Sequence, residues 1–176
     1  LLLKERLRIS YGLRLTYAHG RGYQYGLQSH REDLVLSPRL GVNYSLTAES
    51  SIYGLFDKSF IPQTGLDQQG QGLRPIHGRS LELGFKRDFF AGQLSSTVAI
   101  YQLHRSNLIA SHPMGSGFVQ DGASKAEGLE VDIKGSLSKR IHIIVNYAFT
   151  TAQITADPHN PERVGMATAN LIKHIQ

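Results

Sequence analysis

Cysteine is absent from the 176 residues, so a disulfide framework, a thiolate zinc site and a thiol nucleophile are all excluded. Long apolar runs are also absent. None approaches the roughly 18 to 20 residues that a transmembrane helix needs, which excludes a helical membrane protein. The 18 glycines follow no fixed period, so a collagen-like chain is excluded as well.

Charge is modest and scattered. Nineteen basic residues against fourteen acidic residues give a formal net charge of +5, which suits an anionic partner. The basic residues do not gather into a run or stripe, which argues against a nucleic-acid surface. We therefore expect no nucleic acid among the partners.

The dominant pattern is an alternation of apolar and polar residues with a period of two. Between Leu7 and Tyr17 every odd position is apolar, and the even positions are polar or small. This pattern predicts a strand with one apolar face, of the length that a tilted membrane strand requires. It recurs at 40–46, 81–89, 129–137 and 141–149, and more weakly at 51–60 and 94–107, and an eighth strand is predicted to begin near Ala167.

Short and long connections alternate strictly along the chain. The short ones are 47–49, 90–92 and 138–139, and the long polar ones are 19–37, 61–78, 108–122 and 153–165. In an up-and-down meander, this order places every short turn at one end of the strands and every long loop at the other. That asymmetry is typical of outer-membrane barrels.

A soluble β-sandwich shows the same alternation and remains an alternative, as does a small closed barrel of about eight strands with a structural or adhesive role. Aromatic placement favours the membrane. Tyr44 and Phe89 lie near the short-turn ends, whereas Tyr17 and Phe149 lie toward the long-loop ends, as in interfacial girdles. The predicted fold class is therefore all-β, an antiparallel up-and-down transmembrane β-barrel.

Candidate ligand contacts concentrate in the long connection at 61–78. Gln63, Arg74 and His77 are donors that could meet an anionic or oxygen-rich ligand, although a solvated surface loop is the alternative. The eight histidines are dispersed and form no His-x-x-x-His pair, so we expect no metal site and no intrinsic cofactor.

Catalytic signatures are weak. No Gly-x-Ser-x-Gly elbow is present, and we expect the protein not to be an enzyme. An outer-membrane enzyme with His104 and Ser106 at the barrel rim is kept as an alternative.

Several strand motifs resemble those of TonB-dependent siderophore receptors, and their order is nearest to the ferrichrome or ferric-hydroxamate type. The motifs are Ser37–Tyr44, Ser51–Gly54, Lys58–Gln63, Leu81–Lys86, Gly92–Ser95, Ala99–Tyr101, Gly128–Asp132 and Asn146–Thr150.

This resemblance implies an outer-membrane barrel of about 22 strands with an N-terminal plug, in a Gram-negative bacterium. The implied function is import of ferric siderophores, energised through the TonB–ExbB–ExbD complex. The wall would contact membrane lipid and lipopolysaccharide. Residues 1–176 would supply about eight wall strands and the extracellular capture loops of this one barrel domain, while the plug and the closing strands are absent.

The first residues lack the features of a signal peptide, which agrees with a segment of a longer chain.

Overall fold

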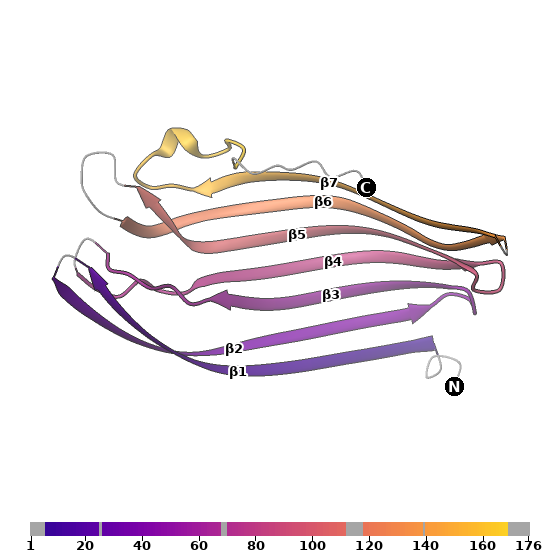
Figure 1. The fold of residues 1–176 in the computed structure, drawn as a ribbon, viewed down its shortest axis with the longest axis horizontal. Coiled ribbons are helices and arrows are strands. Elements are labelled where there is room, and N and C mark those ends of the chain that lie inside the picture. The colour runs from indigo at the N-terminus through magenta and orange to yellow at the C-terminus, as the bar shows by residue number, and fades with distance from the viewer. Residues whose placement is uncertain (1–5, 25, 68–69, 112–117, 139, 169–176) are drawn as a thin grey trace.

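The computed structural model describes residues 6–24, 26–67, 70–111, 118–138 and 140–168. Its strands form a single antiparallel sheet in which each strand pairs with the next one along the chain (Figure 1). The all-β meander predicted from the alternation is confirmed. The strands are β1 (Leu7–Gln24), β2 (Leu27–Ser45), β3 (Ser50–Ile61), β4 (Ile76–Phe89), β5 (Leu94–Ser111), β6 (Phe118–Ser138) and β7 (Ile141–Ala156), and a short 3₁₀ helix, η1, covers Pro161–Arg163.

The chain beyond β7 turns back toward the sheet. Gln153 forms an antiparallel bridge with Ala167, and the Thr168 N–H donates to the Ala152 carbonyl at 3.0 Å. This is the pairing expected where the predicted eighth strand begins. Residues 169–176 lie outside the described part of the chain.

The three turns that join β2 to β3, β4 to β5 and β6 to β7 lie at one end of the sheet, on the right in Figure 1. The turn between β4 and β5 places Phe90, Ala91 and Gly92 in the left-handed region, with φ of 51°, 53° and 86°. The Gly92 N–H donates to the Phe89 carbonyl at 3.1 Å and closes the turn. The predicted short turns are therefore found at this end. At the other end β3 and β4 are joined by the long connection 62–75, but β1 and β2 are joined by residues 25–26 alone.

One predicted loop is instead strand. The segment 19–37 was expected to be a long connection, but β1 and β2 run through it as far as the pair Gln24–Leu27. Its backbone groups are paired along the ladder, although residues 19–33 present no apolar face. At 18 residues, β1 is about 60 Å long at roughly 3.3 Å per residue, well beyond a membrane-spanning strand.

The register gathers the apolar residues on one face, which we name the apolar belt. One row crosses six strands through the successive pairs Tyr44–Ile52, Ile52–Phe85, Phe85–Val98, Val98–Val131 and Val131–Tyr147. The belt comprises Ile9, Tyr11, Leu13, Leu15, Leu36, Leu40, Val42, Tyr44, Ile52, Phe56, Leu81, Leu83, Phe85, Val98, Ile100, Leu129, Val131, Ile133, Val145, Tyr147 and Phe149.

No second layer covers this belt in the described part of the chain. Leu13 is 69% exposed, and among the described residues the buried hydrophobic ones are Leu66, Leu73 and Ala99. A contiguous apolar surface of this extent requires an apolar environment or a partner. Among the described residues, no helix has the length and hydrophobicity needed to span a membrane.

On the opposite, polar face, two tyrosine rings lie over glycines of the neighbouring strand. Tyr53 pairs with Gly84, and Tyr101 pairs with Gly128. Their hydroxyl groups are also fixed, because Tyr53 donates to Glu82 at 2.7 Å and the Tyr101 hydroxyl lies 2.6 Å from Thr150 Oγ1. Each glycine therefore provides the space in which an aromatic ring lies flat on the sheet.

We expect Gly84→Ala to destabilise the complete protein in detergent by about 1–3 kcal/mol, because the added methyl group would overlap the Tyr53 ring. Gly12→Ala is the matched control on the same face. Its methyl group would meet only Arg39 Cβ at 3.9 Å, so a change within about 0.5 kcal/mol is expected. Urea unfolding followed by circular dichroism measures both, and equal losses would show that the ring does not depend on the glycine.

Candidate functional site at the long-connection end

The connection between β3 and β4 is a folded loop at 62–75 that lies on the polar face of the sheet. Within it, the Asp67 N–H donates to the Gln71 carbonyl at 2.8 Å and Leu66 bridges to Gly72. Leu66 and Leu73 are 5% and 3% exposed. Two apolar side chains of the loop are therefore buried, unlike those of a solvated surface loop.

Arg31 attaches this loop to β2. Its Nη1 donates to the Gly72 carbonyl at 3.2 Å, and its Nε lies 2.9 Å from both carboxylate oxygens of Asp33. The two residues are two positions apart on one strand and so share the polar face. Asp33 thus holds the guanidinium in the orientation that reaches the loop.

Gln120 of β6 attaches the other end of the loop. Its side-chain oxygen accepts a hydrogen bond from the Arg74 N–H, and its Nε2 donates to the Arg74 carbonyl at 2.7 Å. The Arg74 guanidinium donates to the Gln120 carbonyl, also at 2.7 Å. Nearby, Asn107 Nδ2 donates to the Pro75 carbonyl at 2.9 Å. Gln120 is 6% exposed, so this latch is shielded from water.

The three predicted ligand residues do not converge. Arg74 and Gln63 lie in the folded loop, where Gln63 Nε2 donates to the neighbouring Pro62 carbonyl at 3.1 Å. His77 lies in β4, paired with Phe60 and Ser106, on the face that carries the apolar belt. Ligand contact by these side chains stays a prediction.

A row of basic side chains borders the apolar belt on the side of the long connections. We name it the cation row: Lys58, Arg79, His104 and Lys125 are successive partners in the ladder of β3 to β6. With strands roughly 4.8 Å apart, the row is about 14 Å long. Lys125 pairs with Glu127 at 2.7 Å, and within the described ranges neither Lys58 nor Arg79 forms an ion pair.

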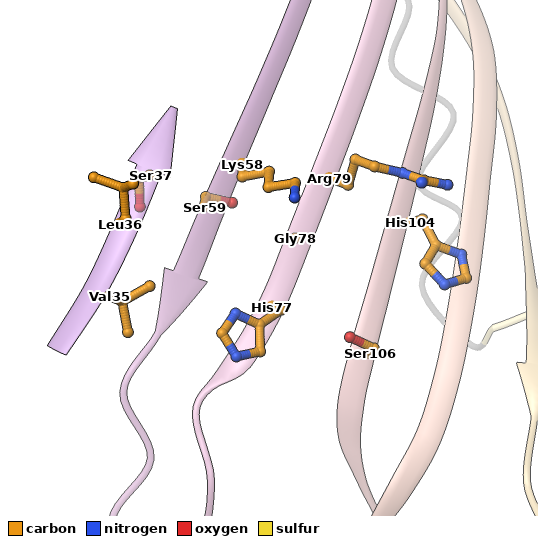
Figure 2. A pocket seen from close by; sticks show the side chains of 10 residues that line it. All are labelled: Val35, Leu36, Ser37, Lys58, Ser59, His77, Gly78, Arg79, His104 and Ser106. Carbon is orange, nitrogen blue, oxygen red and sulfur yellow. The ribbon is translucent and has the colours of Figure 1, made fainter. Parts of the chain in front are cut away.

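A hollow of about 310 Å³ opens beside the cation row, as Figure 2 shows. It lies where the pairing of β2 with β3 has ended, beyond Arg39–Asp57. His104 and Ser106 both line it, but none of the described lining residues is acidic, so the hollow offers no Ser-His-Asp arrangement. Its lining is Val35, Leu36, Ser37, Lys58, Ser59, His77, Gly78, Arg79, His104 and Ser106.

A second cluster, which the dispersed histidines did not predict, lies on the hairpin of β1 and β2. His19 Nε2 lies 3.2 Å from His30 Nδ1, and His30 Nε2 lies 3.1 Å from Glu32 Oε1. Hydrogen bonding with His30, and then with Tyr17, lowers the pKa of the Glu32 carboxyl, which lies beyond the apolar belt. The only sequence signal was the spacing of two between His30 and Glu32.

A single-layer antiparallel meander with one apolar face, one polar face and long connections at one end defines a wall segment of a membrane β-barrel. Residues 2–173 match the family described as TonB dependent receptor-like, beta-barrel. The chain belongs to this family of TonB-dependent receptors.

Curated relatives of this chain are named as receptors. The chain is 32% identical over 147 residues to the metal-pseudopaline receptor CntO of Pseudomonas aeruginosa. This match covers 83% of the chain and 20% of the relative. It is 30% identical over 133 residues to the ferrichrome outer membrane transporter/phage receptor of Escherichia coli K12, covering 75% and 18%. The chain spans about a fifth of the length of these relatives.

Solved structures show the same fold. The alcaligin outer membrane receptor FauA of Bordetella pertussis superimposes with a TM-score of 0.74 at 24% identity, over 89% of this chain and 29% of that one. The ferripyoverdine receptor of Pseudomonas aeruginosa gives a TM-score of 0.71 at 19% identity, over 85% and 21%.

We expect Gln120→Ala to loosen the loop, because it removes the two hydrogen bonds that the Gln120 side chain forms with the Arg74 backbone, at a local cost of roughly 1–3 kcal/mol. Hydrogen exchange of the complete protein, read by mass spectrometry on peptides covering 62–75, should become faster. Gln102→Ala is the control, since it removes one exposed bond to Glu127 far from the loop. Unchanged exchange in Gln120→Ala would contradict the latch.

Proposed function

We propose that this chain forms wall strands and extracellular capture loops of a receptor that imports ferric siderophores across the outer membrane of a Gram-negative bacterium. The observation that carries the proposal is the folded loop at 62–75, held over the polar face by Arg31 and Gln120 at the end where the long connections gather. Membership of the receptor family and the names of its relatives support the same conclusion.

The geometry of the loop suits capture of an oxygen-rich chelate. Arg74 is anchored through one guanidinium nitrogen while its side chain remains exposed, so its other donors face solvent in a fixed orientation. Gln63 adds an amide in the same loop, whereas His77, at the start of β4, lies on the face that carries the apolar belt. We propose these three residues as ligand contacts, and a ferric hydroxamate of the ferrichrome type as the ligand.

In this proposal residues 1–176 are part of one barrel domain of about 22 strands. The plug and the closing strands come from outside these residues, and the TonB–ExbB–ExbD complex supplies energy through that plug. The protein needs no intrinsic cofactor and carries out no reaction on the chelate.

Uptake of radioactive iron tests this function in cells whose sole siderophore receptor is the complete protein. We expect uptake from ferrichrome above the empty-vector level and its loss when TonB is deleted. Arg74→Ala should raise the concentration for half-maximal uptake, whereas Arg140→Ala, an exposed arginine at the short-turn end, should not.

Three outcomes would contradict parts of the proposal. Uptake at the vector level from ferrichrome, ferric pyoverdine and a ferric catecholate alike would reject siderophore import. Uptake that persists without TonB would reject the energy source. Equal effects of Arg74→Ala and Arg140→Ala would reject Arg74 as a ligand contact.

We also propose membrane lipid and lipopolysaccharide as partners of the belt side of the sheet. The cation row lies directly beyond the belt, where phosphate groups of a lipid headgroup region would lie. Lysine and arginine bind phosphate through charge-assisted hydrogen bonds. The hollow beside Lys58 and Arg79 gives such a group room between the strands (Figure 2).

The double substitution Lys58→Glu with Arg79→Glu should remove most of the lipopolysaccharide that purifies with the complete protein in mild detergent. Lys86→Glu with Lys134→Glu changes the net charge equally but on the polar face, and it should leave the amount unchanged. Phosphate analysis of the purified protein measures both, and equal loss in the two variants would contradict binding at the cation row.

A further inference from the structure

We propose that His19, His30 and Glu32 form a binding site for a divalent metal ion such as Zn²⁺, Ni²⁺ or Cu²⁺. The three residues lie on the hairpin of β1 and β2 that extends past the apolar belt (Figure 1). Nothing in the proposed siderophore import requires this site, and it stands or falls independently of that function.

The backbone register brings the three side chains together. His19 and Glu32 are direct partners in the ladder, and His30 is two residues before Glu32 on the same strand. Directly opposed residues of an antiparallel pair have Cβ atoms roughly 4.5–5.5 Å apart. No register shift interrupts the pairing of β1 with β2, so all three side chains project from one face.

The distances between the ligand atoms fit a small metal ion. One nitrogen from each histidine and one oxygen of Glu32 lie within 4.8 Å of one another. The closest approaches are 3.2 Å between the histidines and 3.1 Å between His30 and Glu32. A tetrahedral ion with bonds of about 2.0–2.1 Å separates its ligand atoms by roughly 3.3 Å. His30 can bind the ion through only one of its two ring nitrogens. Metal binding would therefore replace either the hydrogen bond of His30 with His19 or the one with Glu32.

The donor set has the chemistry that such ions select. Two imidazoles and a carboxylate are a known zinc ligand set, and imidazole also suits copper and nickel. The side chains of His30 and Glu32 are 53% and 54% exposed, so an ion can enter directly from solution.

One neighbouring charge opposes binding. Arg21 is the ladder partner of His30 and lies on the same face. Its positive charge repels a cation, so we expect Arg21→Ala to tighten metal binding.

The position of the site indicates its role. His19 and Glu32 follow Tyr17 and Leu34 on the belt face, opposite the face that carries the loop at 62–75. An ion there cannot contact a ligand held under the loop. It would instead link β1 to β2 near the tip of their hairpin. In the described residues, β1 pairs with β2 and has no neighbouring strand on its other side.

Calorimetric titration of Zn²⁺ into the complete protein in detergent tests the site. His19→Ala, His30→Ala and Glu32→Gln should each lower the affinity for one Zn²⁺ ion at least tenfold. Even substitution of residues that only support the metal ligands has an effect of this size. His142→Ala is the control, because this histidine lies at the short-turn end beside Ser136. Absence of Zn²⁺ binding, or unchanged affinity in all three variants, would overturn the proposal.

A measurement on the unmodified protein covers the case in which a variant fails to fold. Diethyl pyrocarbonate modifies free imidazoles, and mass spectrometry identifies the modified residues. Saturating Zn²⁺ should protect His19 and His30 while His142 reacts as before. Equal modification of His19 and His30 with and without Zn²⁺ would overturn the proposal, whatever the state of iron uptake.

Discussion

The antiparallel backbone ladder is the interaction on which the rest of the structure depends. The sheet has one layer, and its large apolar side chains face outward rather than a core, as the 69% exposure of Leu13 shows. Stability must therefore come from hydrogen bonds between neighbouring strands together with a surrounding apolar medium. In such a medium each unpaired backbone group costs several kcal/mol, so a complete ladder is the condition for spanning it. The bridge from Gln153 to Ala167 shows the ladder continuing beyond β7.

The same ladder determines where the functional groups lie. Because side chains alternate between faces, in-register residues of successive strands form rows across the sheet. One row is apolar and forms part of the belt. The cation row is parallel to it, and the cluster of His19 and Glu32 lies further along the hairpin on the same face. The loop at 62–75 is on the other face, so its proposed ligand and the proposed lipid meet opposite sides of one sheet.

The strands, their faces and the meander order could be predicted from the sequence, since a period of two is a local property that each strand shows by itself. The true length of β1 and β2 could not be predicted, because 19–33 has no apolar face to mark it as strand. The candidate site was predicted only in part. Gln63, Arg74 and His77 are near in sequence, yet strand parity separates His77 from the loop. Two sets of contacts depend on strand register and packing: those of Gln120 with Arg74, and those of Glu32 with His30 and His19. A local sequence pattern cannot predict such contacts.

The separation of β2 from β3 connects the remaining features. Their pairing ends at Arg39–Asp57, next to Pro38, which has no backbone N–H to donate. Beyond that point β2 continues with β1 while β3 continues with β4, and the hollow lies between the two pairs of strands. The loop at 62–75 follows directly from β3, and Arg31 of β2 donates a hydrogen bond to it. The loop therefore links β2 to β3 where the backbone ladder between these two strands has ended. Gln120 ties the same loop to β6. The loop is therefore hydrogen-bonded to strands on both sides of the gap, so a ligand bound at the loop, as proposed, would contact an element that joins the two parts of the wall.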